Sequence, residues 1–402
     1  MINVFPYRGL RKVIGLQRFK ESFFDSNLVM VLILIMCSSC IAIYSAQSHG
    51  QYDENFLFKQ ILWFVIGAII ISGVLTFDFE QIERLTPFLY GFGLLLLVLI
   101  LVAPSSLVPE INGAKAWFKF PGVGSVQPSE YMKIFIILML SYITKKHSDS
   151  HEMGDIYSDL KYLLKVGITS GVPILLILKQ NDFGTSLVIL VITATVIFVS
   201  GISWKIISVI VGFAVTAVST LVILFLYKMD WLLLFVDQYQ VNRIYAWLDP
   251  AKYGSDISYQ LKQSITAIGS GMISGKGIGG GEVYIPEAHS DFIFTMIGEE
   301  FGFVGACIVV CLYFILIYRI VIIGFNQMKN MFELYICVGM IGLIMFHVFQ
   351  NIGMVIGLLP ITGIPLPLLS YGGSSVLATM FGLGLILNIS YQQKRSMFSG
   401  DN

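Results

Sequence analysis

The stretch from Ser26 to His49, SNLVMVLILIMCSSCIAIYSAQSH, carries no acidic or basic side chain before its terminal histidine. An apolar run of about 20 residues is long enough to cross the hydrocarbon core of a bilayer as a helix. Five basic residues precede it, and it is too long for a signal-peptide core of about 7–15 residues. We therefore predict a retained first transmembrane helix behind a cytoplasmic tail.

Similar runs recur along the whole chain. Of the 402 residues, 56% are hydrophobic and 12% are charged, whereas a soluble domain has about 25% charged residues. These values exclude an ordinary soluble domain, a disordered chain and a disulfide-stapled module, and a net charge of zero argues against nucleic acid as a partner. We predict an all-α polytopic membrane protein with about ten transmembrane helices, and the predicted spans are 27–47, 57–77, 87–103, 128–144, 161–178, 184–201, 204–227, 291–322, 332–356 and 371–391.

The positive charges orient these spans. With a cytoplasmic N-terminus, 15 of the 25 Lys and Arg residues lie inside and 10 outside. Half of the outer residues lie in one long loop, and long loops count less under the positive-inside rule. We predict a cytoplasmic tail at 1–26, a membrane domain at 27–393 with a large extracytoplasmic loop at 228–290, and a cytoplasmic tail at 394–402.

Asp291 is the first candidate functional residue, because ionisable groups inside lipid are costly and usually serve a function. It is predicted at the outer mouth of the eighth span, close to Glu287 and His289. Partial desolvation there would raise its pKa toward that of a working general base. The alternative is a carboxylate that only interacts with the helix dipole.

Two further charged groups lie in predicted spans. Glu299 would be about 80° around the helix from Asp291, so it could share that side, although a structural pair with a neighbouring helix is an alternative. Glu130 and Lys133 are i, i+3 neighbours that can pair. That pair either neutralises itself within the membrane, or holds Lys133 toward an anionic ligand.

The stretch from Leu359 to Ser375, LPITGIPLPLLSYGGSS, interrupts an apolar region with three prolines and three glycines. Irregular backbone at membrane depth is tolerated only inside protein or beside a water-filled cavity. We predict a broken or re-entrant segment that lines a site, with hydroxyl groups available to a polar ligand from Thr362, Ser370, Tyr371 and Ser374.

Two motifs are rejected as functional sites. Gly275 to Gly280 matches G-x-G-x-x-G by letter but lacks the strand and helix context of a nucleotide fingerprint. Cys37 and Cys40 have the C-x-x-C spacing, yet they lie in an apolar run without a second pair, so we interpret them as small packing residues.

Several blocks of this sequence resemble the SEDS proteins (shape, elongation, division and sporulation) through most of residues 26–393. The resemblance rests on these blocks: GAKAW at 113–117, QPSE at 127–130 with Lys133, DFGT at 182–185, Tyr259-Gln260, Gln263-Ser264, AIGSG at 267–271, GKG at 275–277, 286–300 and 351–375. Within the family, the TGIPLP of residues 362–367 looks like the elongation-type (RodA) members rather than the division-type (FtsW) members.

The resemblance implies a ten-helix peptidoglycan glycosyltransferase of the bacterial inner membrane, active on the extracytoplasmic side. Such a protein transfers a growing lipid-linked glycan chain onto lipid II, releases undecaprenyl diphosphate, and works with a class B penicillin-binding protein and other elongation-complex proteins. The family's essential aspartate falls on Asp291, and its buried acid–lysine pair falls on Glu130 and Lys133. A single base and a direct displacement would invert the anomeric centre.

A leaving diphosphate needs positive charge, which protein cations or a divalent cation, Mg²⁺ or Mn²⁺, would supply. No organic cofactor is expected, and the sequence does not identify a metal site. The substrate-binding candidates are Lys115, Arg243, Lys262, Lys276, Glu287, His289, Glu299, Thr362, Ser370, Tyr371 and Ser374.

Other functions remain compatible with the sequence. A lipid II flippase would use the same ligand, a broken helix and intramembrane charges, but it would have no need of a base at Asp291. A division-type paralogue, a polymerase of another lipid-linked polysaccharide, and a non-catalytic scaffold are the further alternatives.

Overall fold

The structure, a computed structural model, describes residues 25–48, 54–111, 113–120, 124–149, 155–234, 238–250, 252, 256–327 and 330–399. Most of the predicted N-terminal tail, residues 1–24, therefore lies outside the described residues. Eight helices are long and apolar enough to cross a membrane. They are α1 (Ser26–Ser48), α2 (Phe56–Val74), α3 (Phe79–Val102), α5 (Ile156–Leu178), α7 (Trp204–Tyr227), α12 (Gly302–Phe325), α13 (Met331–Val355) and α14 (Gly373–Ser399).

Two more helices complete the ten predicted spans. α4 (Pro128–Asp149) contains too many charges to be recognised by hydropathy, and α6 (Phe183–Val199) is short. Both lie at the centre of the bundle, where α4 packs against α3, α5, α6, α13 and α14. Protein surrounds α4 rather than lipid, so it can carry charged residues. The prediction of an all-α polytopic membrane protein is confirmed.

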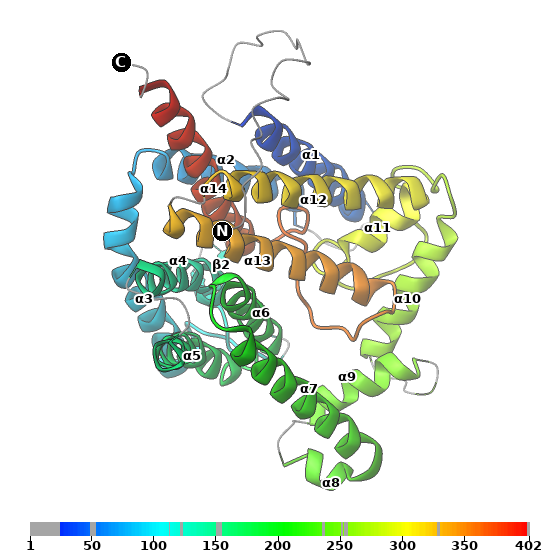
Figure 1. Cartoon of the computed structure of the whole chain (residues 1–402). Coiled ribbons are helices and arrows are strands. Elements are labelled where there is room, and N and C mark those ends of the chain that lie inside the picture. The colour runs from blue at the N-terminus through cyan, green and yellow to red at the C-terminus, as the bar shows by residue number, and fades with distance from the viewer. Residues whose placement is uncertain are drawn as a thin grey trace, which may run out of the picture.

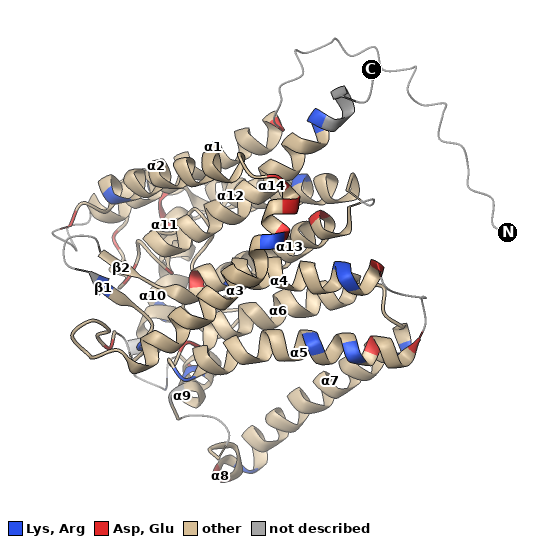
Figure 2. Ribbon diagram, turned by 90° about the vertical axis from the view of Figure 1, so that its left-hand side faces the viewer, with Lys and Arg blue, Asp and Glu red and all other residues tan. Residues whose placement is uncertain are grey.

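Figure 2 shows most of these helices running along a common direction between two ends of the bundle. At one end, which we call the loop side, lie the hairpin of β1 (Phe118–Phe120) and β2 (Gly124–Val126) and the helix α10 (Asp256–Ser270). At the other end, the terminal side, α1 begins and α14 ends. Positive-inside orientation would place the terminal side in the cytoplasm.

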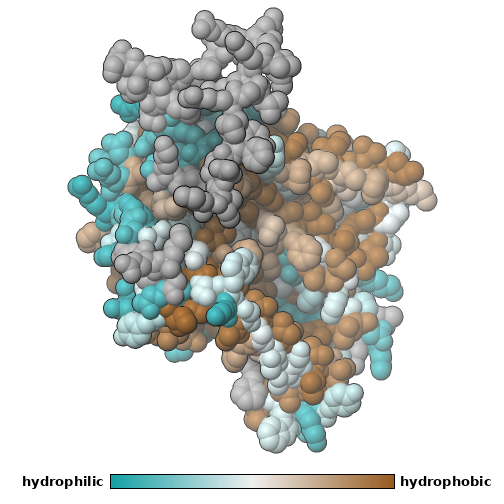
Figure 3. Space-filling view, in the orientation of Figure 1, coloured by the Kyte–Doolittle hydropathy of each residue, from teal (hydrophilic) through white to brown (hydrophobic). Residues whose placement is uncertain are grey.

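α7 stands apart from the bundle. Figure 1 shows it extending away with α8 (Met229–Leu232) at its tip, before α9 (Gln238–Leu248) returns toward the other helices. None of the residues in its most apolar window is buried within the chain. Large side chains such as Phe213 are exposed on it, and apolar residues cover much of the face in Figure 3. Apolar surface of this extent suits contact with lipid.

The predicted eighth span, 291–322, is wrong as a single helix. α11 (Ile293–Glu300) ends at Phe301, and α12 begins at Gly302 with φ of +62°. The amides of Phe303 and Val304 donate to carbonyls of the preceding 271–275 turn, and those of Lys276 and Gly277 donate to the last carbonyls of α11. Because a distant turn satisfies the free backbone groups at the break, two helices replace one.

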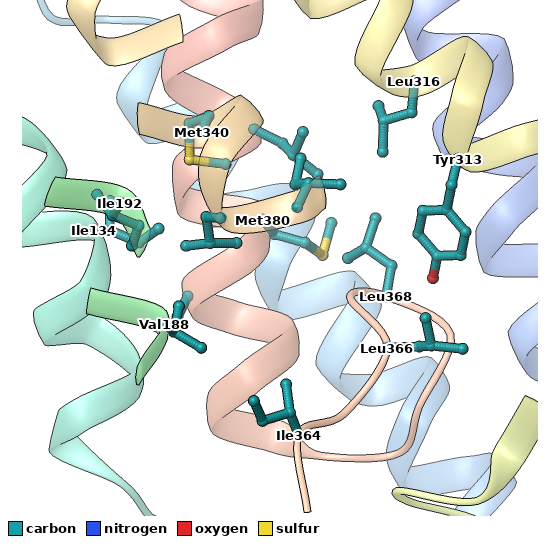
Figure 4. Close-up of a cluster of buried hydrophobic side chains, with 14 of the residues drawn as sticks. Ile134, Val188, Ile192, Tyr313, Leu316, Met340, Ile364, Leu366, Leu368 and Met380 are labelled. Carbon is teal, nitrogen blue, oxygen red and sulfur yellow. The ribbon is translucent and has the colours of Figure 1, made fainter. Parts of the chain in front are cut away.

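Residues 356–372, between α13 and α14, contain no helix, as the proline and glycine pattern predicts; we call them the broken segment. Figure 4 shows Ile364, Leu366 and Leu368 of this segment pointing into the apolar core among α4, α6, α12, α13 and α14. The segment is therefore embedded in protein at membrane depth.

Side chains from five helices, α1, α2, α9, α12 and α13, donate hydrogen bonds to the carbonyls of the broken segment. The donors and acceptors are Trp247 to Gly357, Gln350 to Pro360, Arg243 to Ile361, Asn351 to Ile364, His347 to Pro365, Tyr313 to Pro367, Ser39 to Leu369 and Gln60 to Ser370. Non-helical backbone away from water needs such partners. They fix the position of the segment and of the residues beside it.

Candidate active site

Asp291 lies in the turn of residues 286–292 that leads into α11, at the loop side. The sequence predicts Asp291 at the mouth of the eighth span, and it lies there, two residues before α11 begins at Ile293. Within the described residues, its carboxylate accepts no hydrogen bond. A methyl group built on Gly363 would lie 3.3 Å from Asp291 Oδ2, so the carboxylate faces the broken segment.

The surroundings of Asp291 favour its protonated form. Burial is the largest effect, and together with the negative charge of Glu287 it raises the pKa of Asp291 to about 6, against the opposing influence of Arg243. The side chain nevertheless keeps partial exposure to solvent. A carboxylate with such a pKa is ionised at neutral pH and still basic enough to take a proton in a reaction.

Asn351 and Arg243 connect the broken segment to its neighbours by hydrogen bonds: Asn351 to the turn that carries Asp291, and Arg243 to α9. Asn351 Nδ2 donates to the main-chain oxygens of Asp291 and Ile364, at 2.7 Å in each case. Arg243 Nη1, from α9, donates to the carbonyl of Ile361 at 3.0 Å. The turn that carries Asp291, the broken segment and the long loop therefore meet at one place.

A buried chain of polar groups from α4 and α13 contacts the broken segment on the side that faces the interior of the bundle. Lys133 Nζ lies 2.9 Å from Glu130 and 3.2 Å from His347 Nε2, and His347 Nδ1 lies 2.9 Å from the carbonyl of Pro365. The carbonyl can only accept, so His347 carries its proton on Nδ1 and accepts from Lys133 on Nε2. Glu130 and Lys133 form the predicted pair, and it is connected to the broken segment.

Asp182 connects the starts of two central helices. It is the N-cap of α6, where its carboxylate accepts from the amide and the hydroxyl of Thr185. It also accepts from Gln127 Nε2 at 2.9 Å, just before α4. At Gly184, the second residue of α6, an added methyl group would lie 3.0 Å from the Thr362 carbonyl oxygen. Both helix starts thus lie beside the broken segment.

Glu287, His289 and Tyr371 lie on the outer rim of the site. His289 stacks on Phe56 with ring centroids 4.2 Å apart, and burial lowers its pKa. Its ring also lies 5.5 Å from that of Tyr371. Glu287 is half exposed, with its carboxylate 3.8 Å from His289 Nε2. This rim is aromatic and acidic, which suits contact with a sugar more than with a diphosphate.

Lys276 and Glu299 pair with each other rather than with groups near Asp291. Lys276 Nζ lies 2.8 Å from Glu299 Oε1, which also accepts from the amide of Glu282. Of the two alternatives for Glu299, a helix side shared with Asp291 does not occur, because Asp291 precedes α11. Glu299 instead forms a structural pair, with Lys276 of a loop rather than with a neighbouring helix. This pair closes the loop of residues 271–282 onto the end of α11.

The remaining candidates divide into three kinds. Lys115 and Lys262 have exposed side chains. Ser370 and Ser374 accept main-chain amides, of Leu366 and Gln127 respectively, and so stabilise the local backbone. Thr362 Oγ1 is buried and has no hydrogen-bond partner in the described part of the chain.

The residues around Asp291 do not fit a dedicated metal cage. In the described ranges, no three His, Cys, Asp or Glu side chains converge in a way that could hold an ion.

Gly363 provides a test of the site's geometry. Its φ of +71° is strained for any other residue, and a methyl group would press on Asp291 Oδ2. We expect Gly363→Ala to lower turnover about tenfold, from about 1–2 kcal/mol of combined strain and displacement. The matched control is Gly201→Ala, where φ is +81° and a methyl group would meet no atom within 4 Å. Steady-state assays of both variants make the test; equal losses would show that backbone strain alone matters.

Comparison with known proteins agrees with this arrangement. The family model described as a cell cycle protein, for FtsW, RodA and SpoVE, matches residues 22–395. The chain belongs to the FtsW/RodA/SpoVE family. Membership covers every helix described above, including the broken segment and the turn that carries Asp291.

Two relatives and one solved structure are similar to this chain over most of its length. The probable peptidoglycan glycosyltransferase FtsW of Neisseria gonorrhoeae is 32% identical over 93% of this chain and 86% of its own. The peptidoglycan glycosyltransferase MrdB of Escherichia coli K12 is 32% identical over 92% and 94% of the two chains. A solved structure, described as structural coordination of polymerization and crosslinking by a peptidoglycan synthase complex, is 28% identical with a TM-score of 0.74, over 92% and 98%.

For this member of the FtsW/RodA/SpoVE family, reasoning from sequence missed the parts played by His347 and Asn351. A signal was present: His347, Gln350 and Asn351 follow the i, i+3, i+4 spacing of one helix face within an apolar run. Polar side chains aligned in this way inside a membrane helix point to buried partners. Here the partners are the carbonyls of the broken segment.

Proposed function

We propose that this protein is a peptidoglycan glycosyltransferase that extends glycan strands from lipid II, with Asp291 as its general base. The observation that carries the proposal is the Asp291 carboxylate, which is part-buried, has no hydrogen-bond partner among the described residues, and is fixed beside the broken segment. The names of the relatives FtsW and MrdB support the reaction class.

The chemistry follows from one base and one displacement. A sugar hydroxyl of lipid II attacks the anomeric carbon of the lipid-linked chain, and its proton passes to Asp291. The new carbon–oxygen bond forms as the bond to the diphosphate breaks, and undecaprenyl diphosphate leaves with the electron pair. Attack opposite to the leaving group inverts the anomeric centre.

Arg243 is the best-placed cation for the departing diphosphate. Its charge acts on Asp291, and its guanidinium is tied to the broken segment at Ile361. Lys133 is a weaker candidate, because it is 3% exposed and is occupied by Glu130 and His347. Lys276 is held by Glu299. A planar guanidinium also matches the oxygens of a phosphate.

We assign the protein to cell elongation on the TGIPLP sequence of residues 362–367, since its relatives include proteins named both FtsW and MrdB. A class B penicillin-binding protein is the proposed partner, supported by the similar chain in a complex described as joining polymerization with crosslinking. The proposed location is the bacterial cytoplasmic membrane, with the loop side facing outward.

The deciding experiment gives purified lipid II to the detergent-solubilised full chain, co-purified with its penicillin-binding partner. Moenomycin is present to silence contaminating classical glycosyltransferases. Glycan ladders on a gel are the expected result. A parallel sample in liposomes tests flipping of labelled lipid II. Flipping without ladders would replace the glycosyltransferase by a transporter.

A further inference from the structure

A second polar site lies at the terminal side of the bundle, away from Asp291. The start of α1, the end of α12 and the end of α14 enclose a pocket of about 300 Å³. Figure 2 shows the first and the last of these helix ends on the same side of the molecule. Its polar and basic lining includes Asp25, Asn27, Arg319, Asn326, Gln393 and Lys394.

Arg319 is the unusual member of this lining. It is the one charged residue of α12, and it lies six residues before the end of that helix at Phe325. At a rise of 1.5 Å per residue, it lies about 9 Å inside the helix end. A charged side chain at that depth is costly unless it has partners.

The protein supplies only part of the partners that Arg319 needs. Asp25 accepts from Arg319 Nη2 with one oxygen, and from the amide of Leu28 with the other, as the cap of α1. Arg319 Nε is buried and makes no hydrogen bond within the described ranges, where the guanidinium is bonded to Asp25 alone. A guanidinium has five N–H donors, so most of them lack a protein acceptor.

The charge around the pocket is positive. Two basic side chains, those of Arg319 and Lys394, and one acidic side chain, that of Asp25, line it. A planar guanidinium, an ammonium group and several amides are the groups that bind a phosphate.

We propose that this pocket binds the phosphate headgroup of an anionic phospholipid. A phosphate could also come from a soluble anion, but the lining favours a lipid. Ile322 and Ile323 form an apolar part of the wall beside the basic groups, and the depth of Arg319 matches the boundary between headgroups and acyl chains. Basic pockets between transmembrane helices on the predicted cytoplasmic side suit such headgroups.

The test is to titrate the full chain with lipid in a non-ionic detergent. Its thermal unfolding temperature is measured at each lipid concentration. The probes are phosphatidylglycerol, zwitterionic phosphatidylethanolamine and inorganic phosphate. The double variant Asp25→Asn/Arg319→Gln removes both charges together, which avoids a buried unpaired charge. Arg84→Gln is the matched control, because Arg84 has a side chain 81% exposed.

Phosphatidylglycerol should stabilise the wild type and Arg84→Gln alike. Its apparent affinity should fall about fivefold in the double variant, because the phosphate loses the charge-assisted hydrogen bonds of the guanidinium although the net charge of the pocket is unchanged. If the double variant cannot be extracted in folded form, Lys394→Gln takes its place with the same expectation. Equal affinities in variant and wild type, or equal stabilisation by phosphatidylethanolamine, would overturn the proposal. Stabilisation by inorganic phosphate alone would overturn the lipid assignment.

Discussion

Asp291→Asn should reduce glycan polymerisation by about 10²–10⁴-fold, the range expected when a general base is removed. The change keeps the shape of the side chain and removes its basicity. Because the carboxylate accepts no hydrogen bond from the described residues, few packing contacts change. The rate of ladder formation from purified lipid II, at matched concentrations of folded protein, is the measurement.

The same variant should not be less stable than the wild type. A carboxyl whose pKa is raised on folding, here from 3.8 to about 6, lowers the stability of the folded state progressively as the pH rises between these two values, and the loss is complete above about pH 6. Asparagine has no such cost, so the unfolding temperature at pH 7 should stay level or rise. Asp249→Asn, an exposed carboxylate at the end of α9, is the control and should retain near wild-type activity. Wild-type ladders from Asp291→Asn would remove Asp291 as the base.

Lys133→Met should destabilise the protein by about 3–5 kcal/mol, because it leaves Glu130 charged and unpaired in the interior. Both side chains are nearly inaccessible, at 4% and 7% exposure, and lie 2.9 Å apart. His347 also loses the donor to its Nε2. The fraction of monodisperse protein after extraction and its unfolding temperature would both fall.

Two variants isolate the cause of this effect. Lys145→Met breaks a second pair on α4, with Glu83 at 2.7 Å, but those side chains are 32% and 24% exposed, so its loss should cost about 1 kcal/mol or less. The double variant Glu130→Gln/Lys133→Met should recover much of the stability, since no lone charge remains. If Lys133→Met and Lys145→Met lowered the stability equally, burial of the Glu130–Lys133 pair would not be the cause of the effect.

The sequence was sufficient to predict the membrane-spanning helices, because the length and hydropathy of an apolar run are local properties of the sequence. It also identified α4 and α6 as spans, although one carries several charges and the other is short. It failed at the break between α11 and α12, since the donors and acceptors that permit the break come from residues 271–277. Pairings between distant segments are not visible in a hydropathy pattern.

The sequence identified the ionisable residues of the candidate site, but it predicted fewer of the residues that these groups contact. Glu130 and Lys133 lie one helical turn apart, so their pairing follows from spacing. The pairing of Lys276 with Glu299 depends on how a loop folds back, and spacing could not give it. The broken segment was predicted from its prolines, but its partners His347 and Asn351 had to be seen in place.

The pH dependence of polymerisation tests the role of Asp291 most directly. The base must be ionised, so the rate should rise with pH through an inflection near pH 6, where the pKa of Asp291 is raised by burial and by Glu287. Glu287→Gln should move the inflection to lower pH, and His289→Gln should retain it. A rate that does not change through this range, or an inflection that disappears in His289→Gln, would contradict the account.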